Sequence, residues 1–323
     1  MNNKYHVLVV DTLHEVGQSQ FDARDDIETT VLELPSEEEL LAHVGKADAI
    51  AVRTTKIPRK VIEAAPKLKV VSRHGVGYDS VDVDCLTERG IPLCVAATSN
   101  AVSVAEHAMF MILALAKQSV AFDHATRNDN FWIKLGMGAQ DIAEKSLLIV
   151  GFGRIGSRTA KRALAFDMKV SVLDPYVDDK VIEAAGCTPV SDLDAVLPEM
   201  DFVTLHCPKN TETVNMIGKA QLKSMKKTAV LVNTARGGLI DEEALFDALS
   251  SGDIASAGLD VFAVEPPKSD HPLFQLDNII VSPHSAGVTE QSILRMAYQT
   301  AENVLNVLDG KANPDVIINK QVL

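Results

Sequence analysis

Residues 147–165 read LLIVGFGRIGSRTAKRALA, and this stretch decides the fold of the domain around it. Four apolar residues typical of a buried strand lead into GFGRIG, and a helix-like segment follows directly. In such a turn the first glycine, Gly151, permits the tight bend, and the second, Gly153, lets the backbone approach a pyrophosphate. The third, Gly156, lets the helix pack closely on the strand. The stretch therefore predicts a dinucleotide-binding unit.

The residue at the end of the next apolar run predicts which dinucleotide is bound. Asp174 stands there, 18 positions after Gly156. An acidic residue at this place accepts hydrogen bonds from the adenosine ribose and repels a 2′-phosphate, which favours NAD over NADP. The following residues, Pro175 and Tyr176, supply no cation that would reverse the preference. The glycine turn by itself leaves two other interpretations open, an S-adenosylmethionine site and a purely structural turn.

Apolar runs alternate with helix-like segments along the rest of the chain, which predicts an α/β protein with parallel sheets covered on both faces. Strands are expected to begin at residues 7, 49, 68 and 92, and in a second series at residues 147, 170, 202, 229, 256 and 278. The second series predicts a doubly wound sheet of six strands. Helices are expected at 102–117 and 290–310, and a loop at 127–138. The segment 311–323 is expected to return to the first domain.

Composition limits the partners of this chain. Its 323 residues suggest two domains, and its net charge of −13 disfavours nucleic acid and anionic membranes. The longest apolar stretch, residues 108–116, is shorter than the ~20 residues of a membrane span, and the N-terminus lacks a secretion pattern. The four cysteines show neither zinc-site nor disulfide spacing. We expect a cytoplasmic protein without a metal site.

Three side chains suited to hydride transfer each follow a predicted strand. Arg236 comes after AVLVNTA, Glu265 after SAGLDVF, and His284 after NIIVSP. Histidine exchanges a proton near neutral pH, a carboxylate orients it, and arginine offers a planar fork to a carboxylate. Taken singly, the arginine is equally typical of a solvated loop, the glutamate of a turn, and the histidine of a packed structural side chain. Together they suit a reaction between a nicotinamide and a 2-hydroxy acid.

Several ordered motifs resemble the D-isomer-specific 2-hydroxyacid dehydrogenases, in particular their 3-phosphoglycerate dehydrogenase-like members. These motifs are NTARGGLIDEEAL from Asn233, GLDVFAVEPP from Gly258, SPHSAGVTEQS from Ser282, GFGRIG with Asp174, and RHGVGYDSVD from Arg73. The resemblance implies two lobes of parallel doubly wound sheets. A Rossmann NAD-binding domain, residues 101–289, would be inserted in a flavodoxin-like substrate domain, residues 1–100 plus 290–323. It also implies a cleft for NAD and substrate, and a homodimer formed through the NAD-binding domain.

The resemblance assigns roles to single residues. Arg236 would bind the substrate carboxylate, Glu265 and His284 would relay the proton, and Asp260 would contact the nicotinamide carboxamide. The loop of Gly75, Val76 and Gly77 would offer backbone amides to the substrate. Cofactor contacts are implied for Gly151, Gly153, Arg154, Ile155, Gly156, Asp174, Cys207, Pro208, Thr234, Ala235 and Asp260.

The sequence leaves several alternatives open. The same fold also serves non-catalytic NAD-sensing scaffolds that resemble the C-terminal binding proteins. A formate dehydrogenase would lack the Glu–His relay, and the three clusters disfavour a methyltransferase. The particular 2-hydroxy acid and the direction of the reaction stay undecided. Arg53 and Arg73 either bind a second anion on the substrate or are surface arginines, and His74 stands where many relatives carry Ala. His107 is expected to be packed or interfacial rather than catalytic.

Overall fold

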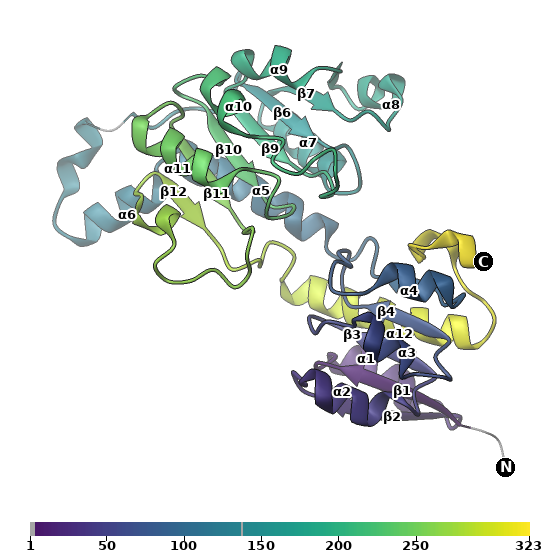
Figure 1. The fold of residues 1–323 in the computed structure, drawn as a ribbon. Helices are drawn as coiled ribbons and strands as arrows, with labels where there is room; N and C mark the ends of the chain where they lie inside the picture. The colour runs from purple at the N-terminus through teal and green to yellow at the C-terminus, as the bar shows by residue number, and fades with distance from the viewer. Residues whose placement is uncertain (1–3, 137) are drawn as a thin grey trace. The chain divides into compact units, whose positions relative to one another are not determined.

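Two units make up the fold of the computed structural model, which describes residues 4–136 and 138–323 (Figure 1). One unit is discontinuous in sequence and comprises Met1–Asn100 and Val288–Leu323. The other, which we call the central unit, comprises Ala101–Gly287. Each unit contains one parallel sheet with its own helices, and each is described by itself.

The sheet of the discontinuous unit has five parallel strands in the order β2-β1-β3-β4-β5. This is the flavodoxin-like strand order, as predicted. Its central strands carry almost continuous apolar runs because helices cover both of their faces. The strands are β1 (Tyr5–Val10), β2 (Ile27–Leu32), β3 (Ala49–Val52), β4 (Val70–Arg73) and β5 (Leu93–Val95).

Helices α1 and α12 pack on one face of this sheet, and α2, α3 and α4 pack on the other. The last segment of the chain runs along the edge strand β5, where Ile317 forms an antiparallel bridge with Cys94. The Asn319 side chain accepts a hydrogen bond from the Leu93 amide at 2.8 Å. The helices of this unit are α1 (Glu15–Asp22), α2 (Glu37–Val44), α3 (Arg59–Glu63), α4 (Val83–Glu88), α12 (Glu290–Leu308), η4 (Pro314–Val316) and η5 (Lys320–Val322).

The sheet of the central unit has seven parallel strands in the order β12-β11-β10-β9-β6-β7-β8. Counted from β6, the first six strands follow the 3-2-1-4-5-6 order of a Rossmann fold, and β12 extends that sheet. The order reverses between β6 and β9, which places the ligand crevice of such sheets at the carboxyl ends of these two strands. The strands are β6 (Ser146–Val150), β7 (Lys169–Leu173), β8 (Thr188–Val190), β9 (Phe202–Leu205), β10 (Val230–Asn233), β11 (Ser256–Leu259) and β12 (Ile279–Val281).

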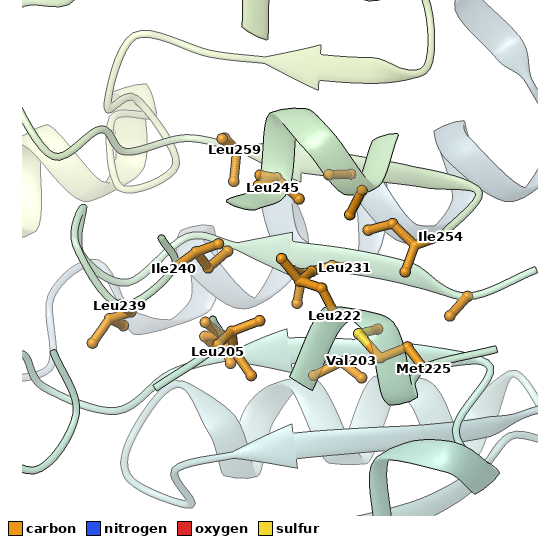
Figure 2. Close-up of a cluster of buried hydrophobic side chains, with 14 of the residues drawn as sticks. Val203, Leu205, Leu222, Met225, Leu231, Leu239, Ile240, Leu245, Ile254 and Leu259 are labelled. Carbon is orange, nitrogen blue, oxygen red and sulfur yellow. The ribbon is translucent and has the colours of Figure 1, made fainter. Parts of the chain in front are cut away.

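Two apolar clusters hold the helices of the central unit on its sheet. Figure 2 shows the cluster beneath α10 and α11, where Leu222 and Leu245 meet Val203 and Leu231 of the strands. The other cluster packs α5, α7 and α8 on the opposite face. The helices are α5 (Ala101–Ala116), α6 (Ser119–Arg127), η1 (Phe131–Leu135), α7 (Gly156–Ala165), α8 (Asp179–Ala184), α9 (Leu193–Val196), η2 (Leu197–Glu199), α10 (Lys219–Ser224), α11 (Glu242–Ser251) and η3 (Pro272–Gln275).

The structure corrects the sequence prediction at two edge strands and in one loop. β2 and β8 were not predicted, because only the end residues of β2 are buried and β8 is a three-residue strand containing Pro189. Edge strands have one neighbour and need less apolar sequence. The predicted loop at 127–138 contains the short helix η1, although its residue 137 lies outside the described residues. In the described part of the chain, no helix is long and apolar enough to cross a membrane.

Candidate active site

The glycine turn links β6 to α7 through three glycines that meet different constraints. Gly151 has a φ of +96°, and a Cβ there would lie 2.7 Å from the Cys207 amide nitrogen at the end of β9. A Cβ at Gly156 would lie 2.0 Å from the Gly151 carbonyl oxygen, so only glycine lets α7 begin here. Gly153 is exposed and a Cβ there would meet no atom within 4 Å. Its backbone is thus open to an anion at the helix N-terminus.

Asp174 connects the glycine turn to the end of β7. Its carboxylate accepts hydrogen bonds from the Phe152 amide at 2.6 Å and from the Tyr176 amide at 3.0 Å, one on each oxygen. Each carboxylate oxygen has a further lone pair. The half-buried side chain is therefore fixed in direction and keeps acceptor capacity toward a hydroxyl group.

Four other predicted cofactor residues lie around the glycine turn between β6 and α7. Arg154 is exposed and Ile155 is half-buried just before α7 begins. Cys207 and Pro208 follow β9, next to Gly151. Burial raises the pKa of the Cys207 thiol to about 11, so it stays protonated and is suited to a backbone contact rather than to thiolate chemistry.

Arg236 lies in a turn that the side chain of Asn233 organises. The buried side chain of Asn233, the last residue of β10, accepts a hydrogen bond from the Ala235 amide at 3.0 Å and donates one to the Arg236 carbonyl at 2.8 Å. Asparagine at a strand end commonly organises a turn in this way, so its position was the available signal. Among the described residues, the buried Thr234 hydroxyl has no hydrogen-bond partner and keeps its capacity for a ligand.

Glu265 and His284 form a direct pair. Glu265 Oε2 lies 2.7 Å from His284 Nδ1, and Glu265 Oε1 accepts a hydrogen bond from the Phe262 amide at 3.0 Å. The pair assigns a proton to Nδ1, which leaves Nε2 as the ring nitrogen that can accept one. Arg236, Glu265 and His284 follow β10, β11 and β12, which are neighbours in the sheet. Their loops therefore meet at one edge of the central unit.

His284 has a φ of +52°, a left-handed backbone conformation that is uncommon among non-glycine residues, although histidine adopts it more often than most. Asp260, 1% exposed, holds the turn around it: Oδ1 accepts from the Ser282 hydroxyl at 2.6 Å and the Ser285 amide at 2.8 Å, and Oδ2 from the Ala286 amide at 2.9 Å. The His284 amide donates to the Asp260 carbonyl at 2.8 Å. Asp260 therefore supports the conformation that presents His284.

His107 on α5 extends this network. Its Nε2 lies 3.0 Å from the Ser282 hydroxyl oxygen, which itself donates to Asp260. The half-buried ring also lies 5.6 Å from that of Phe110. Ser282 begins one of the quoted motifs, but no role was predicted for it, because its partners are far away along the chain.

The predicted substrate loop, Gly75 to Gly77, belongs to the discontinuous unit. Gly75 has a φ of +139°, and a Cβ there would collide with the Arg73 guanidinium, so arginine lies directly over this backbone. His74 is buried, and desolvation together with the charges of Arg53 and Arg73 lowers its pKa to about 4. The His74 ring is thus neutral near pH 7, with two cationic side chains close to it.

The strand order of its sheet and the glycine turn place the central unit among the dinucleotide-binding domains. Residues 109–286 match the family model described as D-isomer specific 2-hydroxyacid dehydrogenase, NAD binding domain. The chain therefore belongs to this family, and the predictions of family, fold class and NAD as cofactor are confirmed.

Three proteins with named activities are similar to this chain. The chain is 40% identical to a D-3-phosphoglycerate dehydrogenase of Methanocaldococcus jannaschii over 96% of its own length and 59% of the relative's. It thus spans about three fifths of that relative. It is 36% identical to a glyoxylate reductase of Korarchaeum cryptofilum, covering 99% of this chain and 97% of the other. A D-lactate dehydrogenase structure from Aquifex aeolicus with NAD and lactic acid has a TM-score of 0.83 at 30% identity, covering 94% and 96% of the two chains.

Proposed function

We propose that this protein is an NAD-dependent oxidoreductase that transfers hydride between the nicotinamide and C2 of a D-2-hydroxy acid or 2-oxo acid. The observation that carries the proposal is the 2.7 Å contact between Glu265 and His284 Nδ1, which fixes Nε2 as the proton acceptor. A scaffold that only senses NAD would have no need for an oriented acid–base pair. The comparison with dehydrogenases and reductases supports the catalytic alternative.

Each group has a defined task in the proposed oxidation. NAD, when bound, accepts the hydride. Arg236 binds the substrate carboxylate through its planar fork, and His284 Nε2 takes the hydroxyl proton. Glu265 stabilises the imidazolium that results, since its carboxylate lies against Nδ1. In the reverse direction His284 returns the proton to the carbonyl oxygen.

The residues around the glycine turn fit a dinucleotide. We assign the pyrophosphate to the backbone of Gly153, Arg154 and Ile155, and the adenosine ribose to Asp174. Cys207, Pro208, Thr234 and Ala235 would contribute contacts on the β9 and β10 side, where the buried Thr234 hydroxyl keeps its hydrogen-bonding capacity. Asp260 would reach the nicotinamide carboxamide through Oδ2, which has one described donor, the Ala286 amide.

For the substrate we propose an acid of the glycerate type, whose carboxylate Arg236 of the central unit binds. For the discontinuous unit, taken by itself, we propose that the backbone amides of Gly75, Val76 and Gly77 serve as substrate contacts. Arg53 and Arg73, whose charges both act on His74, support a second anionic group such as a phosphate. The experiment is NADH absorbance during incubation of NAD with 3-phosphoglycerate, D-glycerate, D-lactate and their L-isomers, and of NADH with glyoxylate and other 2-oxo acids. Turnover of a D-acid supports the proposal. Intact NADH binding with no turnover across the whole panel would contradict it.

Asp174→Asn is expected to reduce the discrimination against NADPH. The amide oxygen can still accept the Phe152 hydrogen bond, whereas the bond from the Tyr176 amide is lost together with the negative charge that repels a 2′-phosphate. We expect the ratio of NADPH to NADH dissociation constants to fall by about tenfold or more, equivalent to about 1.4 kcal/mol. Titration by nicotinamide fluorescence measures both constants. Asp179→Asn, an equal charge change at an exposed site on α8, is the control and should leave the ratio as it is.

We also propose a homodimer formed through the central unit. An apolar patch of exposed side chains lies on α5, α6 and η1, comprising Phe110, Val120, Phe131, Trp132 and Leu135. Helix α6 contacts both α5 and η1, and the rings of Phe131 and Trp132 lie edge to face at 5.6 Å. Exposed aromatic residues of this kind mark protein interfaces.

Trp132→Glu is expected to convert the dimer to a monomer, because it places a charge in the patch where the tryptophan is 68% exposed. Sedimentation velocity across a concentration series measures the association. Leu34→Glu, at an exposed apolar residue of the discontinuous unit, should leave the dimer intact. A wild-type protein that sediments as a monomer at all concentrations would refute the dimer.

A further inference from the structure

The peptide between Phe262 and Ala263, and the Phe262 amide just before it, are held by three groups, which come from the same loop, from helix α11 and from the turn after Arg236. The Phe262 amide donates to Glu265 Oε1 at 3.0 Å. The next amide, that of Ala263, donates to Glu242 Oε1 at 2.6 Å. A Cβ at Gly237 would lie 1.8 Å from the Phe262 carbonyl oxygen, so the turn after Arg236 packs directly against the same peptide. One short segment thus joins the loops of Arg236 and Glu265.

Glu242 anchors the Phe262–Ala263 segment to helix α11. It is the first residue of α11, after the N-cap Asp241, where a carboxylate also interacts favourably with the helix dipole. Its side chain is 19% exposed, which limits its freedom to turn toward solvent. A carboxylate on a rigid helix fixes the position of a neighbouring loop more precisely than a residue on a loop does.

His271 restrains the second oxygen of Glu242. Its Nε2 lies 3.3 Å from Glu242 Oε2, and its ring packs 5.7 Å from Phe262 and 5.1 Å from Phe274. Within the described residues, the buried Nδ1 of His271 has no hydrogen-bond partner. The proton of the neutral ring therefore belongs on Nε2, where it is donated to Glu242, and protonation of Nδ1 would bury an N–H without an acceptor.

We propose that Glu242 is a positioning residue for the acid–base pair, with His271 holding Glu242 in place. Glu242 fixes the Ala263 amide and with it the Phe262–Ala263 peptide, the adjoining Phe262 amide then fixes the Glu265 carboxylate, and Glu265 keeps the His284 proton on Nδ1. The contact of Gly237 with the same peptide extends the restraint to the turn of Arg236. This inference rests on the proposed function of Glu265 and His284 and names a further residue on which that function depends.

The test compares Glu242→Ala with Glu242→Gln. Alanine removes the acceptor for the Ala263 amide, whereas the glutamine side-chain oxygen can still accept that bond. We expect Glu242→Ala to lower kcat by roughly 10- to 100-fold, the size of effect that a small misplacement of catalytic groups produces. Glu242→Gln is expected to recover part of kcat, because its oxygen keeps the Ala263 bond while its amide NH2 group faces the Nε2–H of His271. NADH affinity should be unchanged in both variants. Glu243→Ala, an exposed carboxylate in the same helical turn, is the control for charge near the helix start.

A readout independent of turnover is the tautomer of His284, measured by NMR of histidine labelled with nitrogen-15. We expect a proton on Nδ1 in the wild type and in Glu242→Gln, and a mixture of tautomers in Glu242→Ala. If the proposed reaction is wrong but the positioning role is right, the tautomer changes while the wild type shows no turnover. A folded Glu242→Ala with wild-type kcat and tautomer would overturn the inference. So would a Glu242→Gln as impaired as Glu242→Ala.

Discussion

His284→Asn is expected to lower kcat by roughly 10²- to 10⁴-fold, the contribution of a general acid–base group. Asparagine is the suitable replacement because it tolerates the positive φ of 52° at this position better than most residues. Its neutral amide cannot take up the hydroxyl proton. NADH binding should be preserved, because the glycine turn and Asp174 are not altered. Steady-state kinetics and a fluorescence titration of NADH measure the two effects.

The matched control is His43→Asn, at an exposed histidine near the end of α2 in the discontinuous unit. It should keep wild-type turnover. If His284→Asn were folded and turned over at the wild-type rate, His284 could not be the proton acceptor. If it lost NADH binding together with activity, the loss would reflect damage to the cofactor site instead of removal of the acid–base group.

Arg236→Lys is expected to lower kcat/KM for the acid by about 100-fold, within the range for lost hydrogen bonds to a charged group. Lysine keeps the positive charge but cannot present two parallel N–H groups to a carboxylate. It also lacks the bond of 2.7 Å that the guanidinium makes to the Ala235 carbonyl, so the side chain would be less well directed. A rise in KM for the acid with unchanged NADH affinity is the expected signature.

Arg127→Lys is the control for this substitution, because Arg127 forms an exposed ion pair with Asp123 on α6. Such a surface pair contributes little, so activity should not change. An Arg236→Lys enzyme with wild-type KM and kcat would show that the carboxylate binds elsewhere.

The sequence predicted those parts of the fold that depend on local pattern. The apolar runs at residues 147 and 170 and the glycines between them are local signals, and they correspond to β6, β7 and the turn before α7. The edge strands β2 and β8 escaped prediction because one side of each faces no neighbouring strand, which relaxes the demand for apolar residues. The helix η1 escaped it because its apolar residues are exposed rather than arranged in a buried stripe.

For the site, the residues to which we assign the chemistry were singled out by the sequence, whereas those that hold them in place were not. Arg236, Glu265 and His284 each follow a strand and carry suitable functional groups, so residue type and position led to them, and their catalytic roles stay a prediction. Ser282 and His271 gain their importance only from partners distant in sequence, Asp260 and Glu242. Neither periodicity nor spacing encodes such contacts, because they form only when the strand ends are brought together.

The most direct test of the proposed chemistry is the fate of the hydrogen at C2. The acid that gives the highest turnover is prepared with deuterium at C2 and oxidised with NAD, and the resulting NADH is analysed by mass spectrometry and NMR. We predict that the deuterium is found at C4 of the nicotinamide, with protium in the solvent having no part in the transfer. NADH without deuterium, and deuterium released to water, would contradict hydride transfer from C2 and with it the roles given to His284 and Arg236.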